Sequence, residues 1–130
     1  MIFSTELLDQ LTAQAKQSER HRQHYDLRDS EDDNSQKMLN AIEPEAELTI
    51  HKHPTTAKLI VLVRGSVRMN QYDNDGNVIK QTVLRPDGET FYVVPQDAWH
   101  NLTCLESGSV IYIQKNGKFD PETDTLHLHK

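Results

Sequence analysis

Three histidines have the spacing of a metal site. His51 and His53 stand one residue apart in TIHKHPTTAKLIVLVRG, residues 49–65. Side chains along a β-strand alternate between its faces, so these two imidazoles would point the same way and could share one ion. His-x-His alone is a weak signal, but His100 follows the turn sequence PQDAW at the start of a later β-forming run. Three imidazoles suit a divalent transition metal, so the sequence predicts a site made of His51, His53 and His100.

The rest of the chain supplies the elements that would position these residues. Ser4 and Glu6, followed by an apolar stripe of helical period, predict a helix over residues 4–18. Residues 19–35 are polar and acidic and read as a solvated connection. Residues 36–42 are ambiguous between helix and strand. The expected strands cover residues 47–53, 58–65, 66–72, 77–84, 90–95, 100–106 and 109–115.

Composition narrows the class of protein. A chain of 130 residues fits a single domain, and short strands at regular spacing predict an antiparallel sandwich or barrel. The net charge of −6 and the lack of a basic stripe argue against nucleic acid as a partner. No apolar run approaches the roughly 20 residues of a membrane span. The first residues do not resemble a signal peptide and Cys104 is the single cysteine, so we expect a cytoplasmic protein.

Two motifs of the chain resemble those of the cupin superfamily. Their residues are, in order, His51, His53, Gly65, Gly88, Pro95 and His100. Within the cupins the chain resembles the small WbuC-type cupin-fold metalloproteins. The further marks of that resemblance are RQHYD around His24, QKMLNAIEP over residues 36–44 and KFDP over residues 118–121.

The resemblance implies an all-β fold, the cupin double-stranded β-helix or jelly-roll barrel with a short N-terminal helical extension. It favours a strand at residues 36–42. The expected organisation is an N-terminal helix and connecting arm over residues 1–35 and a cupin barrel over residues 36–130, in one domain and as a homodimer. It places His24 at the mouth of the pocket, where the histidine could act as a general acid or base. Trp99 is a second pocket candidate that could stack on a sugar, although a core role in positioning its loop is the stronger expectation.

Lys58 departs from the family pattern at the position that normally supplies a glutamate ligand. A protonated lysine about 4 Å from a divalent ion would be repelled by on the order of 8 kcal/mol at an effective dielectric near 20. The ammonium could turn toward water, lose its proton or face an anion held between the two cations, or no metal binds. Two milder departures are Asp97 where the motif usually has glycine, which a left-handed turn would tolerate, and Cys104 where asparagine often closes it.

The sequence therefore predicts a cupin-fold metal-binding protein whose three-histidine site binds or acts on a small polar, anionic metabolite. The family resemblance alone implies that this metabolite belongs to polysaccharide metabolism. The cofactor would be a divalent transition metal, with zinc, iron, nickel and manganese left open, and Lys58, His24 and Trp99 would line the substrate pocket. The alternative is a degenerate, metal-free cupin that serves as a small-molecule binding or structural module. Whether the protein is an enzyme is left open.

The C-terminal run holds a second His-x-His, His127 and His129. Chain ends are seldom ordered enough to preorganise a site, so a terminal strand or a frayed tail is the expectation there.

Overall fold

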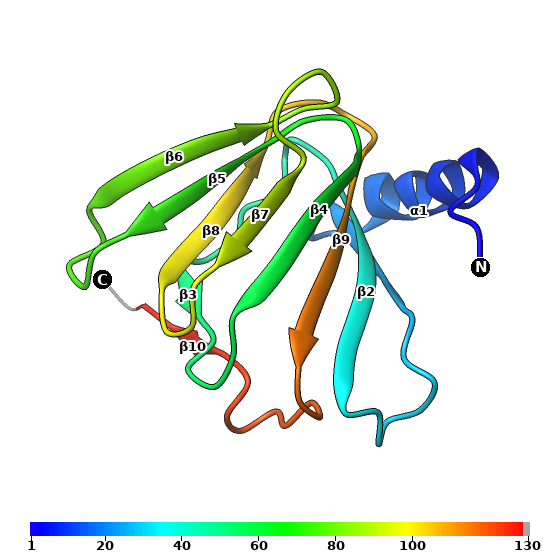
Figure 1. Cartoon of the computed structure of the whole chain (residues 1–130). Coiled ribbons are helices and arrows are strands. Elements are labelled where there is room, and N and C mark those ends of the chain that lie inside the picture. The colour runs from blue at the N-terminus through cyan, green and yellow to red at the C-terminus, as the bar shows by residue number, and fades with distance from the viewer. Residues whose placement is uncertain (129–130) are drawn as a thin grey trace.

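The computed structural model describes residues 1–128 and consists of one helix packed on a two-sheet sandwich (Figure 1). Helix α1 (Thr5–Gln17) begins where the Ser4 hydroxyl accepts a hydrogen bond from the Leu7 backbone N–H, as an N-cap should. Its buried residues Leu8, Leu11 and Ala15 pack on the outer face of one sheet. The expected helix at residues 4–18 is confirmed to within one residue at each end.

Ten strands follow the helix. They are β1 (Arg22–Asp26), β2 (Ser35–Ile42), β3 (His51–Lys52), β4 (Lys58–Arg64), β5 (Val67–Tyr72), β6 (Val78–Leu84), β7 (Phe91–Val94), β8 (Trp99–Cys104), β9 (Ser109–Asn116) and β10 (Leu126–His127). One sheet has the order β1-β2-β9-β4-β7 and the other β10-β3-β8-β5-β6, and all pairings are antiparallel. This is the jelly-roll arrangement of the cupin fold.

The core lies between the sheets and follows the alternation of each strand. On β4, Ile60 and Leu62 point inward, and on β9 Ile111 and Ile113 do so. The opposite face of β2 and β9 presents Leu39, Ala41 and Val110 to the helix. Toward one end of the sandwich the inward positions become polar, with Lys58 on β4 directly opposite Lys115 on β9. That end holds the candidate site.

Strand β1 corrects the expectation that residues 19–35 form only a solvated connection. Arg22–Asp26 pairs with β2 along its full length, with His24 opposite Asn40. Backbone N–H and C=O groups make this pairing, and they do not require an apolar side chain on either strand. The N-terminal segment thus adds an edge strand to the sheet, while the division at residues 35 and 36 into arm and barrel stays a prediction.

Left-handed backbone occurs at several turns, and two of them bear on the sequence analysis. Asp97 has φ of 65°, which agrees with the expectation that its turn needs a conformation usually given to glycine. Gly65, between β4 and β5, has φ of 85°, and a Cβ there would lie 2.6 Å from Ser109 Cα. Within residues 1–128, no helix has the length and apolar character required to cross a bilayer.

Candidate metal centre

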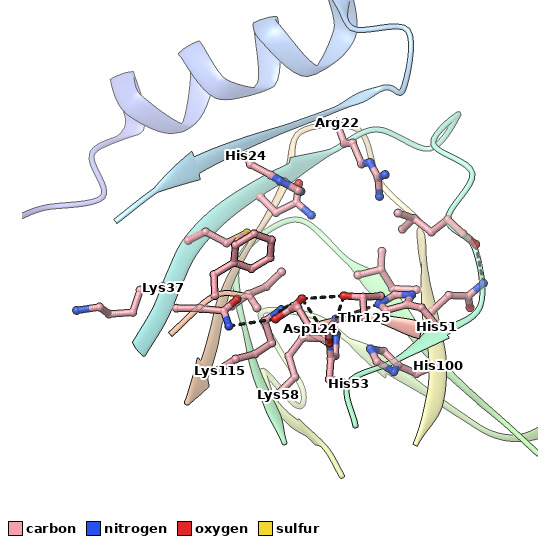
Figure 2. A pocket seen from close by; sticks show the side chains of 18 of the residues that line it. Arg22, His24, Lys37, His51, His53, Lys58, His100, Lys115, Asp124 and Thr125 are labelled. Carbon is pink, nitrogen blue, oxygen red and sulfur yellow. Dashed lines mark hydrogen bonds and ion pairs between the residues drawn. The ribbon is translucent and has the colours of Figure 1, made fainter. Parts of the chain in front are cut away.

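The three predicted histidines meet at one end of the sandwich (Figure 2). His51 on β3 pairs directly with His100 on β8, and His53 follows two residues after His51 on the same side. One ring nitrogen from each lies within 4.8 Å of the others. The ring centroids of His51 and His100 are 4.3 Å apart, and that of His53 lies 5.2 and 5.4 Å from them. Two neighbouring strands of one sheet therefore bring together histidines that lie far apart in the chain.

Backbone carbonyls fix the tautomer of all three rings. The Nδ1 of His51, His53 and His100 lies 2.9 Å from the carbonyl oxygens of Thr49, Asp124 and Ala98 respectively. A carbonyl only accepts, so each Nδ1 must carry the proton and donate it. In the neutral ring, Nε2 then holds a free lone pair, which is the state that binds a metal.

Burial keeps these rings neutral. It is the largest cause, ahead of the charge of Lys58, that lowers the pKa of His51 to about 3, of His53 to about 4 and of His100 to about 2. The Nε2 atoms of His53 and His100 are buried and have no hydrogen-bond partner. Buried polar atoms are rarely left unpaired, so these two nitrogens call for a ligand.

Lys58 lies beside the same point. Its side chain is 8% exposed, and its Nζ is 3.4 Å from His51 Nε2. Burial, followed by the charge of Lys115, lowers the pKa of Lys58 to about 7. The structure thus places Lys58 against the three histidines and brings it close to losing its proton at neutral pH.

Asp124 and Lys115 belong to the site although sequence reasoning did not select them. Lys115 Nζ lies 2.9 and 3.1 Å from the two carboxylate oxygens of Asp124, and both side chains are buried. Gln36 Nε2 and Thr125 Oγ1 donate to the same carboxylate at 3.0 and 2.7 Å. The Asp124 carbonyl accepts the hydrogen bond from His53 Nδ1, so this aspartate joins the buried ion pair to a candidate metal ligand. The alternation of Ile111, Ile113 and Lys115 was the available signal, since it puts a cation on the inner face of β9.

A cavity of about 460 Å³ opens from the histidines toward β1. Its lining includes His24 and Lys58, two of the three predicted pocket residues. In Figure 2, Arg22 and His24 hang from β1 on the far side of the cavity from the three histidines. His24 is exposed on one side, yet desolvation of its ring, followed by the charge of Arg22, lowers its pKa to about 4. It is therefore neutral at physiological pH, which leaves it able to accept a proton but poorly suited to donate one as an imidazolium.

Trp99, the third predicted pocket residue, is not among the residues that line this cavity. It neighbours His100 on β8, and adjacent residues of a strand face opposite sides. Its ring lies under Lys52 Nζ at 4.6 Å, and its Nε1 donates to Asn74 Oδ1. The structure supports the expectation that Trp99 positions loops, not the expectation of a stacking platform inside the pocket.

The second His-x-His does not join the site as a pair. His127 lies on β10 opposite His51, with its Nδ1 2.9 Å from Thr49 Oγ1, so this part of the tail is a terminal strand. His129 lies outside the described residues.

The donor set fits a divalent transition metal on three counts: Nε2 lone pairs, mutual proximity, and two buried nitrogens, of His53 and His100, with no other partner. Within residues 1–128 no carboxylate completes it, since Asp124 is engaged by Lys115. A bound ion would act there as a Lewis acid with its full charge of +2.

Several solved structures have the same architecture as this chain. The chain superimposes on CapF, solved with inhibitor 3-isopropenyl-tropolone, with a TM-score of 0.73 and 20% identity over 87% of this chain and 33% of CapF. Oxalate decarboxylase from Bacillus subtilis gives 0.62 and 20% over 82% of this chain and 27% of that one. KdgF from Halomonas sp. gives 0.62 and 17%, covering 78% and 84%.

These likenesses show the fold, a cupin jelly roll. The chain spans only a third or less of the CapF and oxalate decarboxylase chains. No curated protein matches it in sequence. It belongs to the family described as a domain of unknown function, DUF6016, whose model matches residues 3–84.

Proposed function

We propose that the protein is a metal-binding cupin of the WbuC type, in which His51, His53 and His100 hold a divalent transition metal that binds a small anionic metabolite. The observation that carries this proposal is the convergence of three Nε2 lone pairs whose Nδ1 atoms are all committed to backbone carbonyls. Nothing in that arrangement needs the imidazoles to rotate or to lose a proton before metal enters.

The anionic ligand follows from the charges around the centre. Lys58 and Lys115 lie side by side on the inner face, and Asp124 is the carboxylate that pairs with one of them. A divalent ion beside Lys58 leaves the site with surplus positive charge in a desolvated cavity. An anion bridging the metal and the Lys58 ammonium would relieve the repulsion between them.

Metal content tests the first part of the proposal. Protein purified without a histidine tag should contain close to one equivalent of a transition metal, or should take up one equivalent of zinc by calorimetry after chelation. His100→Gln should lose this uptake, while His127→Gln, a histidine outside the triad, should keep it. A wild-type protein that takes up no metal would overturn the proposal.

A metal-free binding pocket is the second candidate, and a specific distance favours it. At 3.4 Å from His51 Nε2, the Lys58 Nζ occupies part of the space that a metal would need. In this case Lys58 itself would bind the anion, because the neutral histidines present only Nε2 lone pairs to the site. Titration with small carboxylates separates the two functions. A metal-free pocket binds these carboxylates equally well before and after chelation. A turnover screen on nucleotide sugars and small carboxylates with added metal then distinguishes an enzyme from a binding protein.

We further propose that the protein is a homodimer. The strands β6 and β7 at the sheet edges expose Val78, Ile79, Val83, Phe91 and Val93, a set of large apolar side chains that a second copy could cover. Sedimentation equilibrium should give twice the monomer mass of 15.0 kDa.

A further inference from the structure

The cavity has a second polar end that the metal site does not use. Among residues 1–128, four buried side-chain polar atoms have no hydrogen-bond partner: Arg22 Nε, Asn40 Oδ1, His53 Nε2 and His100 Nε2. All four residues line the same cavity. The two imidazole nitrogens are accounted for by a metal, but the guanidinium nitrogen and the amide oxygen are not.

Arg22 and Asn40 are neighbours at the end of the cavity under β1. His24 on β1 pairs with Asn40 on β2, so Arg22, two residues from His24, lies diagonally across from Asn40 on the same face. Asn40 is only 5% exposed, so its side chain is held inside the protein. Figure 2 shows Arg22 on the opposite side of the cavity from the histidines. A ligand that reaches both ends must therefore span the cavity.

One kind of chemical group can form hydrogen bonds with both unpaired atoms. A guanidinium only donates hydrogen bonds, and an amide oxygen only accepts them. A hydroxyl can accept from Arg22 and donate to Asn40 at once, whereas a carboxylate has no proton to offer Asn40. Elsewhere the lining combines apolar and polar side chains, among them Met38, Met69, Leu102, Gln36, Asn101 and Thr125, which suits a carbon chain that carries hydroxyl groups.

We propose that Arg22 and Asn40 form a hydroxyl-binding subsite, so that the ligand is a small polyhydroxy acid. Its hydroxyl groups lie under β1, and its acid group lies at the end formed by the histidines and Lys58. The placement of the acid group rests on the proposed function, whereas the hydroxyl subsite rests on Arg22 and Asn40 alone. A cavity of about 460 Å³ is large enough for such a molecule.

Three six-carbon probes test the subsite by calorimetry, each titrated into zinc-loaded and chelated protein. Gluconate carries both groups, hexanoate carries only the acid, and sorbitol carries only hydroxyls. Gluconate should bind at least about tenfold more tightly than hexanoate, as expected for one net hydrogen bond, and more tightly than sorbitol. Asn40→Leu and Arg22→Met should each bring the gluconate-to-hexanoate ratio close to one. Both acids carry one negative charge, so a change in long-range attraction cancels in this ratio.

Lys37→Met is the matched control. Lys37 is also among the lining residues, but it pairs with Asp33 and points away from the histidines, so its loss should leave the ratio unchanged. Asn40→Leu replaces a buried oxygen that has no partner, and its thermal unfolding temperature should hold or rise. If Asn40→Leu does not fold, Arg22→Met, at a half-buried position, still decides the question.

The outcomes separate this subsite from the metal. If zinc does not bind but the ratio is present and falls in the variants, the metal proposal fails and the hydroxyl subsite stands. If zinc binds but wild-type protein shows no gluconate binding, a ratio near one, or a ratio that both variants retain, the subsite is overturned and the metal site is untouched.

Discussion

The charge of Lys58 determines whether the three histidines can bind a metal ion. Its Nζ is 3.4 Å from His51 Nε2, and its neighbour across the sheet is another lysine, Lys115. Burial and Lys115 together lower the pKa of Lys58 to about 7, so a modest additional repulsion from a metal would deprotonate it. A neutral amine could even approach the ion as a ligand. The site thus tolerates a lysine in a place where a permanently charged arginine would exclude a metal.

Changing the charge at position 58 should raise zinc affinity stepwise, from wild type to Lys58→Met to Lys58→Glu. Lys58→Met removes the repulsion and should strengthen zinc binding by at least about tenfold, equivalent to about 1.4 kcal/mol. Lys58→Glu adds a carboxylate ligand and should strengthen it further. Competition against a chelating dye measures both affinities.

Lys37→Glu controls for net charge in that series. It makes the same charge change on a side chain that points away from the histidines, and should alter zinc affinity little. Equal affinities for wild type, Lys58→Met and Lys58→Glu would show that Lys58 does not face the metal.

At the scale of elements, the segment after β9 acts as a clamp on the site. Asp124 neutralises Lys115 through its side chain and orients His53 through its backbone carbonyl. Although burial alone would raise it, the hydrogen bonds from Lys115 and Thr125 lower the pKa of this carboxyl. The orientation of His53 therefore depends on a segment about 70 residues further along the chain.

Removing one member of the buried pair should cost more than removing both. Asp124→Ala leaves Lys115 buried without a partner and should lower the free energy of unfolding by about 3–5 kcal/mol. Adding Lys115→Met to that variant should recover most of the loss. Urea unfolding of the two single variants and the double variant measures the coupling. Additive losses would mean that the pair does not interact as the 2.9 Å contact indicates.

The turn between β4 and β5 requires a glycine at position 65. Gly65→Ala should lower the free energy of unfolding by more than about 2 kcal/mol, because it adds a steric clash with Ser109 to the strain of a left-handed residue. Gly117→Ala is the matched control: Gly117 has φ of 92° but nothing within 4 Å of an added Cβ. That variant should lose only the strain, about 1–2 kcal/mol. Equal losses would show that the close approach to Ser109 is relieved without cost.

The elements that could be predicted from sequence are those whose alternation is apolar. The strands from residue 58 to residue 115 bury Ile60, Leu62, Ile111 and similar residues, and alternation with turn residues locates them. The histidine site was predictable for the same reason, since a spacing of two guarantees a shared face. Asp97 was also interpretable, because a residue in place of a motif glycine points to a left-handed turn.

The elements that could not be predicted face the cavity. Strand β1 turns Arg22, His24 and Asp26 toward a polar space, so its inner face carries no apolar signal. A strand was predicted over residues 47–53, but β3 is reduced to two residues because its neighbours β8 and β10 pair with it only briefly. A strand that lines a binding site loses the periodicity that identifies strands, so the gap in the sequence analysis coincides with the candidate site.

For the whole molecule, the site concentrates groups that burial holds in their neutral forms, and this should make stability depend on pH. In the unfolded chain an imidazole has a pKa near 6.5, whereas the folded values for His51, His53 and His100 are about 3, 4 and 2. Between pH 6.5 and about 4 the unfolded chain therefore binds protons that the folded protein does not. Each ring then lowers the free energy of unfolding by about 1.4 kcal/mol per pH unit as the pH falls.

Lys58 acts in a different window with the same sign. Its folded pKa of about 7 lies below the ordinary 10.5, so the unfolded chain binds the extra proton between these values and stability rises with pH across them. Metal-free protein should accordingly lose stability steeply below pH 6.5 and gain it slowly above pH 7.

Urea unfolding of chelated protein from pH 4.5 to pH 9.5 checks both limbs. Lys58→Met should flatten the alkaline limb and leave a falling acid limb, while His100→Gln should make the acid limb shallower. An acid limb whose slope is the same in His100→Gln as in wild type would mean that His100 is not buried in its neutral form. That result would remove the physical basis for a preformed three-histidine centre.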